Sequence, residues 1–177
     1  MIISVRKAIG TGPTELAAFD QALVKAGVAN FNLIYLSSVL PPNSQIQLEA
    51  NHIPPKGEWG DKLYVVMAQM RTEKVNSEAW AGVGWIQDEL TKKGLLVEHE
   101  GSSEQQVRRD ISNSLTGLAQ NRQLDLGDQQ MEVIGARCTG EPICALVVAV
   151  FESAAWEGNK PAPTKSKLHR ILKKKGK

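Results

Sequence analysis

The chain contains few of the residues that build disulfide scaffolds and metal sites. Its 177 residues include two cysteines, Cys138 and Cys144, and three histidines that stand far apart. A structural zinc site takes four Cys or His ligands at short, regular spacings, so we expect no metal site. The cysteines flank a turn-like run at 140–142, where a hairpin disulfide is geometrically possible. We favour reduced core thiols instead, as in cytosolic proteins.

Long apolar runs are missing as well. No stretch approaches the ~20 apolar residues that a membrane-spanning helix needs. In residues 1–7 the charges follow the apolar residues, which is the reverse of a secretory signal. We therefore expect a cytoplasmic protein with no membrane partner. An apolar content of 42% is ordinary for a globular protein, and the length suits one domain with a substantial core.

The distribution of charge separates a body from a tail. Residues 160–177 hold eight of the 21 Lys and Arg residues and no acid, so the other thirteen bases and 19 acids give the body a net charge of −6. Residues 160–164 have the composition of a flexible linker. RNA or an anionic membrane would suit such a tail. We favour a solvated tail and expect no nucleic-acid partner, because no aromatic residue lies between the charges and no base-reading motif accompanies them. The expected division is a domain at 1–159 followed by this tail.

One segment near the N-terminus has the pattern of an amphipathic helix. We expect a helix over 13–26, since a proline suits its first turn and Gly27 suits the position just past its end. Its apolar stripe includes Leu16 and Leu23. Asp20 lies one turn from both leucines, which places a carboxylate at the border of the buried face.

The rest of the body alternates strand patterns with one more helix. The run 28–36 carries apolar side chains on both faces, which indicates a strand covered on both sides in a layered architecture. A capping box at 102–106 starts a second helix that ends near residue 120. Further strands are expected at 62–70, 79–86, 94–99, 130–138 and 143–151. Two helices and many strands indicate an α+β fold.

The most distinctive residues are Ser37 and Ser38, which end an apolar run just before Pro41 and Pro42. The prolines hold the chain extended, so it cannot relax into a helix after the serines. Under such backbone strain a serine hydroxyl can attack the carbonyl before it by an N-to-O acyl shift. Elimination and hydrolysis of the ester then leave an N-terminal pyruvoyl group. An ordinary strand end and loop is the alternative that these four residues also fit.

Four segments, taken in order, resemble the pyruvoyl-dependent arginine decarboxylase family. They are G-T-G at 10–12, L-A-A-F-D at 16–20 with A-G at 26–27, N-L-I-Y-L-S-S-V-L-P-P at 32–42 and G-L-L-V-E-H-E-G at 94–101, and the likeness spans about residues 2–152. The resemblance implies an α/β/β/α sandwich in a single domain. It also implies a proenzyme cleaved between Ser37 and Ser38 into a β chain of residues 1–37 and an α chain of residues 38–159 plus the tail.

The activity implied by this resemblance is decarboxylation of L-arginine to agmatine and carbon dioxide. A pyruvoyl cofactor derived from Ser38 would supply the electron sink that ordinary side chains lack. Asn32 would hydrogen-bond around that group and stabilise the oxyanion of self-cleavage. Glu98 would be the proton donor, with apolar flanks and Glu100 on the same strand face keeping it protonated. Asp20, with the leucines one turn to either side, would bind the substrate guanidinium.

Asn32 and Ser38 are too far apart along one straight strand to share a site. Six residues of strand span roughly 20 Å. We therefore expect the site to form between protomers, with Asn32 and Asp20 from one and the pyruvoyl group from its neighbour, in line with the homotrimers or dimers of trimers that the resemblance implies. Two alternatives stay open: an unprocessed relative that serves as a scaffold or basic-tailed binding module, and a pyruvoyl decarboxylase of another amino acid.

Overall fold

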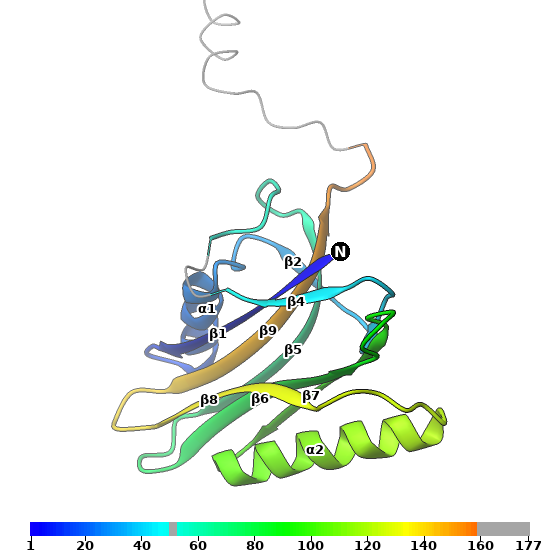
Figure 1. Ribbon diagram of the computed structural model, residues 1–177. Helices are drawn as coiled ribbons and strands as arrows, with labels where there is room; N and C mark the ends of the chain where they lie inside the picture. The colour runs from blue at the N-terminus through cyan, green and yellow to red at the C-terminus, as the bar shows by residue number, and fades with distance from the viewer. Residues whose placement is uncertain (50–52, 159–177) are drawn as a thin grey trace, which may run out of the picture.

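Two β-sheets and two α-helices make up the computed structural model, which describes residues 1–49 and 53–158 (Figure 1). The first sheet has the strand order β2-β5-β9-β1-β4, and the second has the order β3-β7-β6-β8. The predicted α+β fold is confirmed. In chain order the elements are β1 (Ile2–Thr11), α1 (Glu15–Ala26), β2 (Asn32–Tyr35), β3 (Val39–Leu40), β4 (Gln45–Leu48), β5 (Lys62–Thr72), β6 (Glu78–Gln87), β7 (Gly94–Gly101), α2 (Glu104–Asn121), β8 (Gln130–Arg137) and β9 (Ile143–Ala154).

The core is divided among three hydrophobic clusters. One lies between the two sheets and includes Val66 of β5, Leu96 of β7 and Val147 of β9. A second lies between α1 and the first sheet, and a third lies between α2 and the second sheet. Each helix therefore covers the outer face of one sheet, as the positions of α1 and α2 show (Figure 1).

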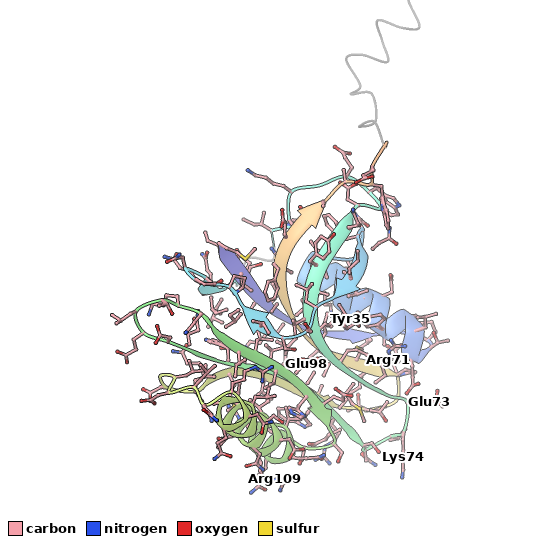
Figure 2. All side chains as sticks on the ribbon, turned by 90° about the vertical axis from the view of Figure 1, so that its right-hand side faces the viewer. Tyr35, Arg71, Glu73, Lys74, Glu98 and Arg109 are labelled. Atoms are coloured by element: carbon pink, nitrogen blue, oxygen red, sulfur yellow. The ribbon has the colours of Figure 1, made fainter. Side chains whose placement is uncertain are left out.

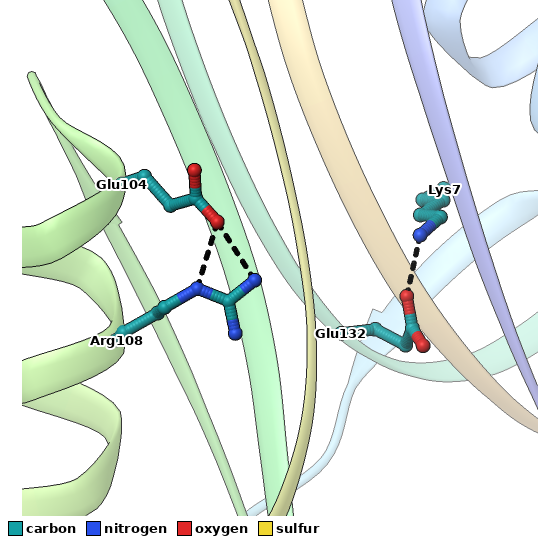
Figure 3. Close-up of polar contacts among 4 residues, drawn as sticks. All are labelled: Lys7, Glu104, Arg108 and Glu132. Carbon is teal, nitrogen blue, oxygen red and sulfur yellow. Dashed lines mark hydrogen bonds and ion pairs between the residues drawn. The ribbon is translucent and has the colours of Figure 1, made fainter.

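Surface ion pairs tie some of these elements together. Lys7 of β1 and Glu132 of β8 join the two sheets, with 2.6 Å between Nζ and Oε2, and Arg108 meets Glu104 one turn earlier in α2 at 2.7 Å (Figure 3). Lys7 and Arg108 are about half exposed. Pairs of this kind contribute about 0–1 kcal/mol each, so the buried clusters stabilise the fold far more.

Helix α1 lies close against β1 because both present small residues. Thr14 caps the helix by accepting a hydrogen bond from the backbone N–H of Ala17, and Gly27 ends it with a φ of 75°. Ala18 is fully buried against β1, where a Cβ on Gly10 would come within 2.0 Å of the Ala18 carbonyl oxygen. The predicted helix is confirmed, although it begins after its cap rather than at the proline.

Helix α2 follows the predicted capping pattern. The Ser103 side chain accepts a hydrogen bond from the Gln106 N–H. Val107, Ile111 and Leu115 are fully buried on the second sheet, at the expected helical spacing. The second predicted helix is therefore confirmed as well.

The run 28–36 is not the long, doubly covered strand that its pattern predicted. Strand β2 is four residues long and forms an edge of the first sheet, and Tyr35 is 60% exposed. Leu33 packs in the α1 cluster while Tyr35 stays at the rim. Apolar bulk on both faces thus did not distinguish an edge strand from a central one. The strand that is covered on both sides is β9, whose residues 143–150 are all buried.

Three observed strands were not predicted. Strand β1 escapes the period-two pattern because Arg6 and Lys7 interrupt its apolar residues. Arg6 is nevertheless 5% exposed, and its guanidinium donates to the carbonyl oxygen of Ala26 at the end of α1, at 3.1 Å. A cation is favourable at a helix C-terminus. Strands β3 and β4 have two and four residues, too few to show a period.

The cysteines lie in the core as free, buried thiols. Burial raises the pKa of the Cys144 thiol to about 11, and the charge of Arg71 opposes that shift. None of the described helices is long and apolar enough to cross a membrane. Within residues 1–49 and 53–158, no group of three or more His, Cys, Asp and Glu side chains is placed to hold a metal ion.

Candidate active site

The chain passes from the first sheet to the second in the short crossing between β2 and β3. Leu36 still belongs to the first sheet, where its N–H donates to the Val65 carbonyl oxygen at 2.9 Å. Ser38 already belongs to the second, where its carbonyl oxygen accepts from the Leu96 N–H at 3.0 Å. The φ of Ser38 is 48°, in the left-handed region that disfavours side chains other than glycine. The predicted cleavage junction therefore coincides with a strained backbone.

The hydroxyl group of Ser38 meets a carboxylate. Its Oγ donates to Oε2 of Glu98 at 3.0 Å, in a partly buried position. The contact depends on β3, which pairs with Gly94 and Leu95 of β7 and so brings Ser38 alongside that strand. The described part of the chain adds no further strand pairing on this side of β7. Two residues predicted from separate motifs are therefore in direct contact.

Ser38 and Glu98 open onto a hollow of about 520 Å³ beside α2. His99 follows Glu98 in β7, so its side chain lies on the opposite face of the strand and points toward α2. Its Nε2 lies 2.8 Å from Oγ of Ser114. The residues that line the hollow are Ser37, Ser38, Val97, Glu98, His99, Ser114, Gly117, Leu118, Asn121 and Arg122. The polar ones give the hollow several hydrogen-bonding groups next to the predicted cleavage junction.

The α2 residues of this hollow were missed from the sequence. Ser114, Leu118 and Asn121 follow the i, i+4, i+7 spacing of one helix face, next to the buried stripe of the helix. That spacing was the available signal. It did not show that the polar part of this face borders Ser38, because no sequence pattern relates α2 to the β2–β3 crossing.

Tyr35 was also missed, although it lies three residues before Ser38. Tyr35 is 60% exposed, and the partial burial of its phenol raises the pKa; Arg71 lowers the pKa, and the charges of Glu100 and Glu98 raise it. Figure 2 shows Tyr35, Arg71 and Glu98 on the side turned towards the viewer. Tyr35 is therefore a neutral hydrogen-bonding group at physiological pH, within electrostatic reach of Glu98.

Asp20, Leu16 and Leu23 lie together on α1, where they line a different hollow with Phe19. Leu16 is 67% exposed, and the guanidinium of Arg71 stacks on the Phe19 ring, 4.2 Å from its centroid. Among the described residues, the two hollows share no lining side chain. Within one chain, the predicted substrate-binding residues therefore line a different hollow from Ser38 and Glu98.

Asn32 is likewise held away from Ser38 within one chain. Its Nδ2 donates to the carbonyl oxygen of Gly60 at 2.5 Å, and Nε1 of Trp156 donates to the same oxygen at 2.9 Å. The backbone N–H of Asn32 donates to the carbonyl oxygen of Asp61 at 2.8 Å. The amide of Asn32 thus binds the loop before β5 and makes no hydrogen bond to the cleavage junction.

The fold and the site define an α+β domain in which Ser38, a residue with strained backbone, is hydrogen-bonded to the carboxylate of Glu98 near the crossing between the two sheets. The chain belongs to the family of pyruvoyl-dependent arginine decarboxylases, since the model of that family matches residues 2–155. The resemblance seen in the four sequence segments is confirmed. Membership in this family also implies a pyruvoyl prosthetic group.

Individual relatives carry the same description. The pyruvoyl-dependent arginine decarboxylase of Thermococcus kodakarensis is 27% identical over 149 residues, which cover 81% of this chain and 90% of the relative. That of Picrophilus torridus is 31% identical over 99 residues, or 55% of this chain and 54% of the relative, so the chain spans about half the length of that relative. A solved structure of pyruvoyl-dependent histidine decarboxylase at pH 8 gives a TM-score of 0.42 at 10% identity, covering 66% of this chain and 61% of the other.

Proposed function

We propose that this protein decarboxylates L-arginine to agmatine and carbon dioxide, after cutting its own backbone between Ser37 and Ser38. The observation that carries the proposal is the 3.0 Å hydrogen bond from the strained Ser38 hydroxyl to Glu98. Membership in the family supports arginine as the substrate. The proposal includes one domain, residues 1–159, in the α/β/β/α sandwich of the family. The basic tail at 160–177 lies outside the described residues.

Self-cleavage starts at the Ser38 hydroxyl. Its oxygen attacks the carbonyl carbon of Ser37 while Glu98 accepts the hydroxyl proton. The peptide C–N bond between the two serines then breaks, and Glu98 returns the proton to the leaving nitrogen, which becomes an amine beside the new ester. Loss of the Ser38 α-proton then breaks the Cβ–Oγ bond and releases Ser37 as a carboxylate. Water hydrolyses the remaining enamine, so that one water is consumed and one ammonia leaves. Relief of the left-handed backbone at Ser38, worth about 1–3 kcal/mol, favours the reaction.

The surroundings of Ser38 fit a pyruvoyl group at its position. The carbonyl of residue 38, which stays conjugated to the new ketone, already accepts a hydrogen bond from the Leu96 N–H at 3.0 Å. When present, the pyruvoyl group supplies the sink for the electron pair that carbon dioxide leaves behind. Glu98 lies against this position and is placed to give a proton to the substrate carbon, so each turnover consumes one proton.

The complete site is proposed to form between protomers of a trimer or a dimer of trimers. The Asp20 hollow and the Ser38 hollow share no lining side chain, which supports this division. Asp20, Leu16, Leu23 and Asn32 would then come from one protomer. Asp20 would pair with the planar guanidinium of arginine through two hydrogen bonds.

A cytoplasmic location is part of the proposal. Cys138 and Cys144 are free and buried, which suits a reducing compartment.

Intact-mass measurement followed by arginine turnover tests the function. The wild type should appear as two chains whose summed mass reflects the gain of one water and the loss of one ammonia, and it should release agmatine. Ser38→Ala should remain one chain and be inactive. The matched control is Ser37→Ala, which keeps the attacking hydroxyl and should still be cut.

Two outcomes would replace this function with another. A wild type that stays one chain after prolonged warming would indicate an unprocessed scaffold or binding module. A cut protein that prefers another amino acid in a substrate panel would retain the chemistry and change the substrate.

A further inference from the structure

Arg122 stands at the end of α2, in the hollow that contains the cleavage junction. It is the C-cap residue of the helix, and its Nη1 lies 3.4 Å from the carbonyl oxygen of Leu118, which is a long contact for a hydrogen bond. Among the described residues that line this hollow, Arg122 alone carries a permanent positive charge, and Glu98 carries the negative one. Neither self-cleavage nor decarboxylation, as described above, uses Arg122.

Cleavage changes the charge of this hollow. The peptide carbonyl of Ser37 becomes a carboxylate, and the new first residue of the larger chain carries a ketone in place of an amino group. The carboxylate therefore arises without the ammonium group that ordinary hydrolysis would leave beside it. Cleavage thus adds one negative charge close to Glu98.

Ser37 borders two hollows, and the hollow beside α2 has more polar side chains in its lining. The other hollow is lined by Glu152, by Met1, whose N-terminal ammonium group donates to the carbonyl oxygen of Asn43, and by mostly apolar side chains, namely Leu36, Val39, Pro41, Tyr64, Phe151 and Ala154. A carboxylate placed there would lose water to apolar surface, which is costly. The hollow at α2 offers the Arg122 guanidinium together with Asn121 and Ser114.

We propose that Arg122 holds the carboxylate that cleavage creates on Ser37, and thereby positions the cut end beside Ser38. This inference rests on the proposed self-cleavage. A guanidinium can hold a carboxylate by two parallel hydrogen bonds. In the uncut chain, no carboxylate among residues 1–49 and 53–158 forms an ion pair with Arg122. Arg122 is a positioning residue here, because it acts on the chain end and does not touch the reacting atoms.

A double-mutant cycle on the thermal unfolding midpoint tests the pair. Arg122→Gln is made in the wild type, which carries the carboxylate, and in Ser38→Ala, which does not. In the cut protein the substitution should lower the midpoint by about 2 °C, as expected for a partly exposed ion pair. In the Ser38→Ala background it should change the midpoint by less than half of that, since only the helix-end contact is lost. In the cut protein, Arg122→Lys should lower the unfolding midpoint by less than Arg122→Gln does.

Arg109 provides the matched control. It lies on the same helix, away from Glu98 (Figure 2), and is 63% exposed. Arg109→Gln should shift the cut and uncut proteins equally. A second measurement needs no substitution at Arg122: raising sodium chloride from about 0.05 M to about 1 M should lower the midpoint of the cut wild type relative to that of Ser38→Ala, because salt screens the added pair.

Equal shifts of Arg122→Gln in both backgrounds, together with equal salt responses, would overturn the proposal while leaving self-cleavage intact. A wild type that is never cut would overturn both, since the carboxylate would not exist. The proposal would also be overturned if Arg122→Gln raised the KM for arginine while its midpoint shifts in the two backgrounds were equal. That result would assign Arg122 to the carboxylate of the substrate instead.

Discussion

Glu98 contacts the one hydroxyl group that self-cleavage would consume. As a carboxylate it can accept the proton of Ser38, and as an acid it can return a proton to the substrate carbon. Strand β3 pairs only with Gly94 and Leu95 of β7, so on that edge of β7 no strand among the described residues pairs next to Glu98. Glu98 can therefore take part in both proton transfers from the same position. A single side chain would thus serve the making of the cofactor and its use.

Glu98→Gln separates hydrogen bonding from proton transfer. The amide keeps the size of the side chain and an accepting oxygen, but it can neither take up nor give a proton. We expect turnover per cut chain to fall by about 10²–10⁴, and cleavage to slow. The cut fraction is followed by intact mass and turnover by agmatine release. Unchanged turnover per cut chain would remove Glu98 from the decarboxylation step.

Because of Cys144, the free energy of unfolding should fall as the pH rises through the alkaline range. The folded thiol has a pKa of about 11 against an ordinary value of 9.0, because burial disfavours the thiolate. The unfolded thiol ionises first as the pH rises, so the free energy of unfolding should fall by up to about 1.4 kcal/mol per pH unit between these values. Urea unfolding at several pH values measures the slope. Cys144→Ala should flatten it, and an unchanged slope would refute the assignment.

Among the elements, α1 depends on the absence of a side chain on its neighbouring strand. A methyl group at position 10 would meet the backbone oxygen of Ala18 at 2.0 Å, and backbone cannot move aside cheaply. Gly10→Ala should therefore destabilise the protein by about 3 kcal/mol. Gly117→Ala is the control, because nothing lies within 4 Å of its added methyl in α2, and it should stabilise by about 0.5–1 kcal/mol. Urea unfolding of both variants checks the contrast.

The elements that sequence could predict are those with caps or sustained periods. Pro13 and Gly27 marked the ends of the first helix, and the capping box around Ser103 marked the start of the second, so both helices were predicted. Strand β1 was not predicted, because an arginine in the sequence indicates a surface position. Arg6 is buried because its guanidinium donates to the carbonyl oxygen of Ala26 at the end of α1, and the sequence does not show that contact. The contact of Ser38 with Glu98 also lay beyond sequence patterns, since it needs the antiparallel pairing of a two-residue strand with β7.

For the whole molecule, the proposed sharing of the site predicts complementation between inactive variants. Asp20→Ala should retain the proposed pyruvoyl group, and Ser38→Ala should retain the Asp20 carboxylate that is proposed to bind the guanidinium. Random co-assembly in a ring should give roughly a quarter of the wild-type sites both parts. Agmatine release by the co-expressed mixture is compared with that of each variant alone. No recovery in verified mixed oligomers, or full activity of a monomer, would contradict a shared site.

Strand β1 lies between β9 and β4, and it belongs to the segment before Ser37. A backbone cut at the junction would therefore leave the shorter piece in the first sheet, with β1 as an interior strand, β2 at one edge and α1 still attached. Dissociation of that piece would demand global denaturation. Renaturation would then become a second-order reaction between two polypeptides, and its yield would depend on the concentration of both.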